Sequence, residues 1–74
     1  MSKEIVSRDR FVELVNEEVI RHPKYKDGTK VLEINTARAC GFEFYVDPAA
    51  NRKEQEAVIV EAKAFIGKKY DFEK

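Results

Sequence analysis

A lone cysteine limits how this chain can fold. Cys40 is the only cysteine among 74 residues, and His22 is the only histidine. An internal disulfide is therefore impossible, and a structural zinc site, which takes four ligands, lacks its cysteines and histidines. Domains of this size remove only roughly 60% of the unfolded chain's surface from water, and many depend on a disulfide, a metal or a partner subunit. Self-association is the remaining route to extra stability.

The composition predicts one folded domain spanning residues 1–74. Hydrophobic residues make up 43% of the chain, including five phenylalanines and three tyrosines, which is more apolar surface than disordered segments carry. Fourteen basic residues balance fourteen acidic ones. A neutral chain has no overall field that attracts nucleic acid or an anionic membrane from a distance.

Nothing in the sequence resembles a membrane span or an export signal. The longest apolar runs are far shorter than the ~18 residues that a membrane helix requires. Near the N-terminus only Ile5 and Val6 are apolar before charged residues resume. With a single cysteine, a reducing compartment is the default. We therefore expect a cytoplasmic protein without a membrane partner.

The first half of the chain predicts a helix from Ser7 to about Arg21. Ser7 is a suitable N-cap, and Pro23 forces the end of the helix because it pushes His22 out of the helical region. The apolar positions recur at helical spacing. They are Phe11, Leu14, Val15 and Val19.

Two strands are predicted over residues 31–36 and 42–46, joined as a hairpin. Apolar and polar residues alternate in both segments, which is typical of half-buried strands. The pattern puts Leu32 and Ile34 on the face that also carries Phe42, Phe44 and Val46. A three-residue loop, Ala39-Cys40-Gly41, preserves that facing, with Gly41 in the left-handed region.

A second helix is predicted from Asn51, its N-cap, to Gly67, whose left-handed conformation would end it. Its core stripe is Val58, Ile59, Ala62, Phe65 and Ile66.

The expected fold class is therefore α+β. Two helices pack on a small antiparallel sheet in the order helix, strand, strand, helix. Ile5 and Val6 near one end, or Tyr70 to Phe72 near the other, could add a short extra strand. The sequence leaves that choice open.

No catalytic, cofactor-binding or metal-binding residues can be assigned. A nucleophile needs an activating base, and the serines, Ser2 and Ser7, both lie at the N-terminus. Cys40 at a hairpin tip is expected to be a small turn residue rather than a reactive thiolate. The three glycines stand too far apart to form a phosphate-binding loop. We therefore expect a protein that is not an enzyme and needs no cofactor.

Candidate self-association residues lie on the second helix and the second strand. Ala57, Val60 and Ala64 form a stripe of small side chains apart from the core stripe, which permits close approach of another helix. Tyr45 points outward from the strand and has both an aromatic ring and a polar group. An open hairpin edge could also pair with another chain. The alternative is a solvated, alanine-rich helix face.

Basic residues gather in the loop after the first helix. Arg21, Lys24, Lys26 and Lys30 flank Tyr25, and basic residues interleaved with an aromatic can bind phosphates and stack a base. The alternative is a loop of solvated charges. No Gly-x-x-Gly loop or RNP-like aromatic segment is present.

These observations predict a non-catalytic cytoplasmic module that binds protein or regulates another protein, and that self-associates as a homodimer. The main alternative is a nucleic-acid-binding module that uses the 21–30 loop. A third is an enzyme with a site shared across a homodimer.

Overall fold

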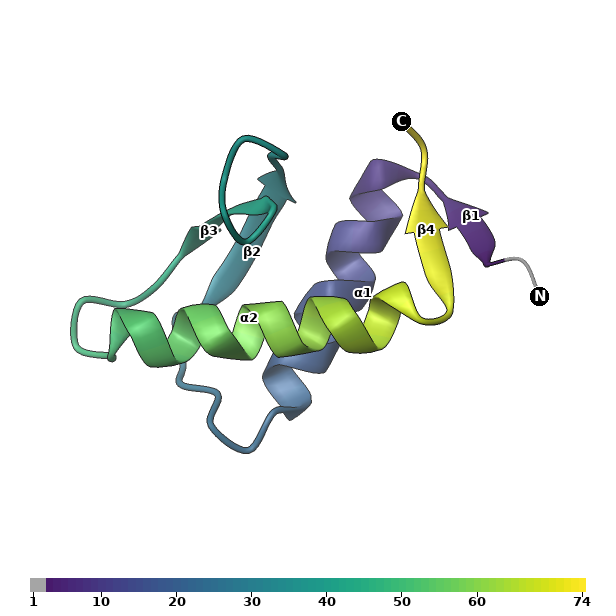
Figure 1. Ribbon diagram of the computed structural model, residues 1–74. Coiled ribbons are helices and arrows are strands. Elements are labelled where there is room, and N and C mark those ends of the chain that lie inside the picture. Colours follow the sequence, from purple (N-terminus) through teal and green to yellow (C-terminus); the bar gives the residue numbers. More distant parts are fainter. Residues whose placement is uncertain (1–2) are drawn as a thin grey trace.

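The computed structural model describes residues 3–74, so Met1 and Ser2 lie outside the described residues. Its elements follow the order β-α-β-β-α-β. They are β1 (Glu4–Val6), α1 (Arg8–Arg21), β2 (Lys30–Ile34), β3 (Phe42–Tyr45), α2 (Arg52–Gly67) and β4 (Tyr70–Phe72). The two helices cross in the middle of the molecule, with the β2-β3 hairpin at one end and β1 and β4 at the other (Figure 1). The α+β class and the central order helix, strand, strand, helix are confirmed.

Both helices begin where the sequence predicts. The Ser7 hydroxyl accepts a hydrogen bond from the Arg10 N–H at 3.1 Å, and the Asn51 side chain accepts one from the Glu54 N–H at 3.0 Å. Each cap satisfies a backbone donor that has no partner inside its helix. The first helix ends at Arg21, because His22 before Pro23 takes an extended conformation.

The predicted left-handed end of α2 at Gly67 is wrong. Among the described residues, positive φ angles occur only at Gly28 and Gly41. The helix instead tightens in its last turn, where the Lys68 N–H bonds to the Phe65 carbonyl and the Lys69 N–H to the Ile66 carbonyl. Such bonds satisfy the terminal carbonyls without reversing the chain, so no left-handed residue is required.

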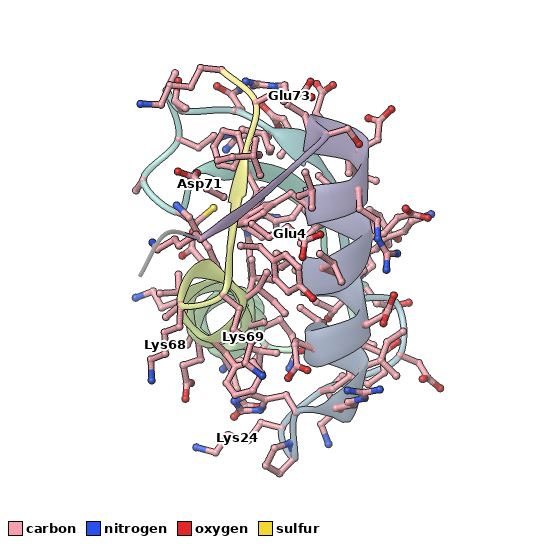
Figure 2. The ribbon with its side chains drawn as sticks, turned by 90° about the vertical axis from the view of Figure 1, so that its right-hand side faces the viewer. Glu4, Lys24, Lys68, Lys69, Asp71 and Glu73 are labelled. Atoms are coloured by element: carbon pink, nitrogen blue, oxygen red, sulfur yellow. The ribbon has the colours of Figure 1, made fainter. Side chains whose placement is uncertain are left out.

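The first and last strands, β1 and β4, pair with each other in parallel (Figure 2). In their register Glu4 lies opposite Tyr70 and Val6 opposite Phe72. The ring of Phe72 then packs edge-on against Phe11 of α1, with 4.9 Å between ring centres. Each of the two segments that could add a strand therefore forms one, but the two make a sheet of their own and do not extend the hairpin.

The β2-β3 hairpin is antiparallel and contains a β-bulge. Val31 pairs with Phe44 and Ile34 with Phe42, but Glu33 pairs with Glu43, which leaves Leu32 as an extra residue. Val31 and Ile34 are three positions apart, so regular alternation would point their side chains to opposite faces of the hairpin. The extra residue of the bulge offsets this, and both side chains point at the core. The prediction that Leu32 faces the core is therefore wrong, and Leu32 is 55% exposed.

The hairpin loop is longer than predicted. It runs over residues 35–41 and contains two successive turns, in which the Arg38 N–H bonds to the Asn35 carbonyl and the Gly41 N–H to the Arg38 carbonyl. Gly41 does adopt a left-handed conformation, with φ of 86°. Cys40 is not at an exposed tip, because the second turn folds it into the core, where its thiol donates to the Phe42 carbonyl.

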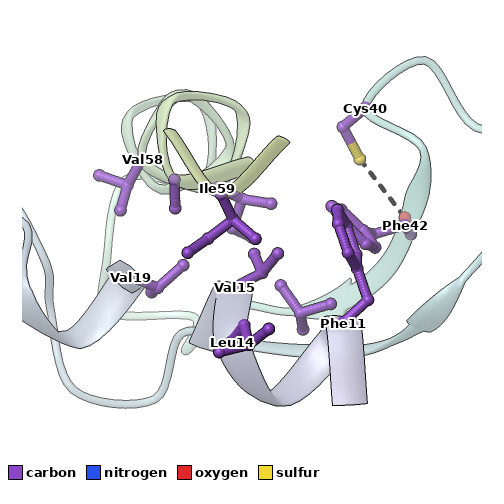
Figure 3. Packing of buried hydrophobic residues seen from close by; sticks show 11 residues of the cluster. Phe11, Leu14, Val15, Val19, Cys40, Phe42, Val58 and Ile59 are labelled. Atoms are coloured by element: carbon purple, nitrogen blue, oxygen red, sulfur yellow. Dashed lines mark hydrogen bonds between the residues drawn. The ribbon is translucent and has the colours of Figure 1, made fainter. Parts of the chain in front are cut away.

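The core lies where both helices meet the inner face of the hairpin (Figure 3). The four predicted residues of α1 are buried, as are Val58, Ile59, Ala62 and Ile66 of α2. Phe65 was expected among them but is 48% exposed. It lies at the margin of the stripe, near the end of α2, where Lys69 extends over its ring.

One polar side chain, Gln55, lies at the centre of the α2 stripe and is fully buried. Its Oε1 accepts hydrogen bonds from the Lys26 N–H at 3.0 Å and the Thr29 hydroxyl at 2.7 Å. Its Nε2 donates to the Lys24 carbonyl at 2.9 Å. A buried polar group costs little when it is fully hydrogen-bonded, so Gln55 holds the loop after α1 on the core.

We expect Gln55→Leu to lower the free energy of unfolding by about 2 kcal/mol or more. The substitution keeps an apolar side chain of similar size but leaves three polar groups of the loop without partners, at a cost of about 1–3 kcal/mol for each one that stays buried. Urea denaturation followed by circular dichroism measures the change. As a control, Lys53→Leu on the exposed side of the same helix should shift stability by less than about 0.5 kcal/mol. Equal stability of the two variants would contradict this role for Gln55.

Candidate functional site

An apolar hollow of about 530 Å³ lies beside the hairpin, where α1, the following loop and both hairpin strands meet. We call it the Tyr45 hollow. The side chains that form its apolar lining are Ile20, Tyr25, Leu32 and Tyr45, and Lys30 lies among them.

The exposed side chains of the hollow set it apart from the rest of the surface. Six large apolar residues among residues 3–74 are exposed by roughly half, and three of them line the hollow. Ile20 is 61% exposed, Leu32 55% and Tyr45 51%. Single exposed apolar side chains are common on soluble proteins, whereas a cluster of them in one hollow is unusual.

Asn16 fixes α1 against the hairpin. Its Nδ2 donates to the Val31 carbonyl at 2.9 Å, and the Val31 N–H donates to its Oδ1 at 2.8 Å. The side-chain amide thus pairs with the outer edge of β2 much as a neighbouring strand would. Ile20 follows one helical turn later on the same side of α1, so this pairing places Ile20 next to the hairpin.

The bulge and the buried Gln55 position two other residues of the hollow, Leu32 and Tyr25. The bulge makes Leu32 the unpaired residue of β2, and its side chain projects to solvent rather than into the core. Gln55 holds the backbone of Lys24 and Lys26 on either side of Tyr25, whose ring packs partly against the core. The hollow is therefore built on well-fixed backbone.

The structure separates the four residues predicted for self-association. Tyr45 lines the hollow described above. Ala57, Val60 and Ala64 are exposed on α2 and line two shallower depressions on either side of Val60. The predicted stripe on α2 is therefore exposed, but Tyr45 is not part of the same surface.

The basic residues predicted for nucleic-acid contact are also divided. Lys30 and Tyr25 line the hollow, and Lys24 and Lys26 are exposed on the loop. The Arg21 guanidinium lies 3.3 Å from the Glu18 carboxylate of its own helix. Tyr25 is partly buried, because its side chain packs against the core.

Cys40 and His22 form their hydrogen bonds with other groups and not with each other. The Cys40 thiol donates to the Phe42 carbonyl. The His22 Nδ1 accepts from the Lys24 N–H at 3.0 Å, and its Nε2 lies 3.5 Å from the Glu61 carboxylate. Of the two serines, Ser7 lies within the described residues, where it caps α1.

Two features are absent from the described part of the chain. Residues 3–74 contain no group of three or more histidine, cysteine, aspartate or glutamate side chains placed to hold a metal ion. Within the same range, neither helix is long and apolar enough to cross a membrane.

A charged cluster lies at the end of the hairpin. The Glu43 carboxylate accepts hydrogen bonds from the Arg38 guanidinium at 2.9 and 3.2 Å and from the Asn35 amide at 2.6 Å. The guanidinium and the amide both favour the ionised carboxylate, so they lower the pKa of Glu43 below its ordinary value. The carboxylate likewise raises the pKa of Arg38.

Comparison with known proteins does not assign this arrangement to a family. No protein-family model, curated protein or solved structure matches the chain.

Two residues of the hollow, Ile20 and Leu32, were not identified from the sequence. Ile20 lies almost opposite the core stripe of α1, and that unusual position for an isoleucine is a signal that helical plotting can detect. Leu32 was assigned to the core because regular alternation hides a bulge. The side-chain pairing of Asn16 with Val31 leaves no pattern in the sequence.

We expect the acid sensitivity of folding to depend partly on Glu43. Its lowered pKa in the folded state stabilises the protein above the unfolded value of about 4.3, and this stabilisation is lost as the pH falls through the folded value. The difference in stability between the wild type and Glu43→Gln should therefore shrink between pH 7 and pH 3. Urea denaturation at each pH measures it.

Glu73→Gln is the control for this measurement, because no ion pair involves that carboxylate among the described residues. Its stability difference from the wild type should change little with pH. A Glu43→Gln difference that stays constant down to pH 3 would contradict the stabilising role of this cluster.

Proposed function

We propose that this protein is a non-catalytic interaction module of the cytoplasm, which binds a protein partner through the Tyr45 hollow and also self-associates. The observation that carries the proposal is the convergence of Ile20, Leu32 and Tyr45, all exposed by more than half, on one hollow. Burying these side chains against a partner removes apolar surface from water, which is the main source of binding free energy.

The chemistry of the hollow suits a protein ligand. Tyrosine is enriched in the energetically dominant parts of interfaces because it combines a large ring with a hydroxyl group. The hollow contains two tyrosines, Tyr25 and Tyr45, and Leu32 and Ile20 provide aliphatic surface between α1 and the hairpin. Lys30 is the one charged side chain that lines it, so it offers a single ionic contact.

The fixed backbone around the hollow also supports binding. Asn16 joins α1 to β2 by two hydrogen bonds, and Gln55 joins the Tyr25 loop to α2 by two bonds to backbone groups. A site on well-fixed elements loses little conformational entropy when a ligand binds.

Nucleic-acid binding is the competing proposal, and one observation favours it: Lys24, Lys26 and Lys30 are all exposed near the Tyr25 loop. Binding of a mixed single-stranded oligonucleotide that weakens steeply with salt and is lost in a Lys24→Glu, Lys26→Glu double variant would support it. If no binding is detected at low salt, this alternative fails.

The interaction proposal predicts which variants lose a peptide ligand. Peptides selected from a random displayed library against the wild type should bind Leu32→Ser and Ile20→Ser about tenfold more weakly. Each substitution removes an exposed apolar side chain from the hollow, and about 1.4 kcal/mol of lost burial corresponds to a tenfold change in affinity. Isothermal titration calorimetry measures the affinities.

Phe65→Ser is the matched control, since Phe65 is 48% exposed but lies on α2 outside the hollow. Its affinity should equal that of the wild type. If every selected peptide binds Leu32→Ser and Ile20→Ser as tightly as Phe65→Ser, the hollow is not the binding surface.

A further inference from the structure

The small sheet of β1 and β4 has an edge that is open to solvent. β1 lies outside β4 at the end of the molecule opposite the hairpin, and β4 is its main neighbour (Figure 1). The alternate residues Lys3, Ile5 and Ser7 along this stretch are all exposed, and Ile5 is exposed by 61%. Unpaired strand edges are sites where another chain can add a strand.

Two hydrogen bonds to β4 show which backbone groups of β1 point outward. The Glu4 N–H donates to the Lys69 carbonyl at 3.1 Å. The Val6 carbonyl accepts from the Glu73 N–H at 3.0 Å. In a strand, the N–H and the carbonyl of one residue point to the same side, and successive residues alternate. Glu4 and Val6 therefore bond to β4, whereas both groups of Ile5 point away from it.

The peptide bonds on either side add one outward group each. The N–H and the carbonyl of a trans peptide bond point in opposite directions, and the described chain has no cis peptide bond. The Lys3 carbonyl therefore points outward, because the next N–H points to β4. The Ser7 N–H points outward because the preceding carbonyl accepts from β4. Within residues 3–74, none of these four outward groups has a hydrogen-bond partner.

We propose that a second copy of this chain pairs on this edge, with the two β1 strands antiparallel about a two-fold axis at Ile5. The Ile5 residues of the two copies exchange both of their backbone hydrogen bonds. The Ser7 N–H of each copy donates to the Lys3 carbonyl of the other, so all four outward groups are used. This inference rests on the self-association in the proposed function and gives it a surface and a register.

A two-fold interface must match itself, and this edge does so in its hydrogen bonds and in its side chains. The acceptor of Lys3 and the donor of Ser7 lie at equal distances on either side of Ile5, so reversing the strand brings each donor to an acceptor. The exposed Ile5 side chains of the two copies lie next to each other and bury apolar surface. The two short sheets also become one sheet of four strands, which is more stable in water than a pair alone.

The neighbouring registers are less favourable. An axis at Glu4 would place the Glu4 carboxylates of the two copies directly opposite each other, where like charges repel. An axis at Val6 would pair Ile5 with Ser7 of the second copy and would need the Ser7 carbonyl as an acceptor. That carbonyl already accepts from the Phe11 N–H at 2.9 Å. The axis at Ile5 avoids both problems.

A proline at position 5 tests the inference. Ile5→Pro removes one outward donor but keeps the bonds between β1 and β4, because the Ile5 N–H does not point to β4. Ile5→Val is the matched control, since it has a side chain of similar size to proline and keeps the N–H. We expect the dimer of Ile5→Pro to be about tenfold weaker than that of Ile5→Val in sedimentation equilibrium, because two hydrogen bonds are lost from each dimer.

Folding of the single chain is checked separately by urea denaturation of dilute protein. Ile5→Pro and Ile5→Val should unfold at similar urea concentrations, because neither removes a bond within the chain. Val6→Pro removes a donor that points to β4 and should unfold at a lower urea concentration than either. A weaker dimer of a folded Ile5→Pro variant then cannot result from loss of the fold.

Amide hydrogen exchange of the wild type gives a second test that needs no substitution. The Ile5 and Ser7 amides should exchange fast in dilute protein and become protected as the dimer forms. The Glu4 and Val6 amides point toward β4, so they should exchange more slowly than Ile5 and Ser7 in dilute protein.

Three outcomes are distinguishable. Weaker association of Ile5→Pro than of Ile5→Val, with protection of the Ile5 and Ser7 amides in the dimer, supports the inference. A dimer in which these amides exchange as fast as in dilute protein, or in which the two variants associate equally, overturns the β1 edge and leaves self-association through another surface. A chain that remains monomeric at millimolar concentration overturns both, whereas peptide binding at the Tyr45 hollow is decided by its own variants.

Discussion

The pairing of one side-chain amide with one strand residue organises this molecule. By taking both backbone groups of Val31, Asn16 closes the outer edge of β2 and fixes the distance between α1 and the hairpin. Ile20 and Leu32 therefore line the same hollow. A helix that merely packed on the sheet face would have left the groups of Val31 without this partner and would have formed no hollow beside the hairpin.

The core shows how a chain without disulfides can hold a long loop in place. Most of the buried residues are aliphatic or aromatic, but the centre of the α2 stripe is Gln55. An apolar residue there would add a little burial and leave three polar groups of the loop unpaired. Gln55 buries less apolar surface than such a residue would. In return, its hydrogen bonds hold the loop that carries Tyr25 on the core.

The sequence predicts the elements of this fold better than it predicts their surfaces. Helix limits follow from local chemistry, such as the Ser7 and Asn51 caps and Pro23, and these predictions are confirmed. Tertiary features are different: the bulge at Leu32 inverts a facing that strict alternation predicts. The sequence predicts Tyr45 as a contact residue, but its neighbours in the hollow come from α1, the following loop and β2, and no local pattern links them.

The parallel pairing of β1 with β4 brings together the first and last elements of the described chain. Almost the whole described chain separates these strands, so their contact is among the most non-local in the molecule. Non-local contacts slow folding because closing a long loop costs conformational entropy. The two strands also form a short pair, at the end of the molecule opposite the hairpin (Figure 1). Local opening that begins there would separate the strands while the hairpin and its pairing with Asn16 stayed intact.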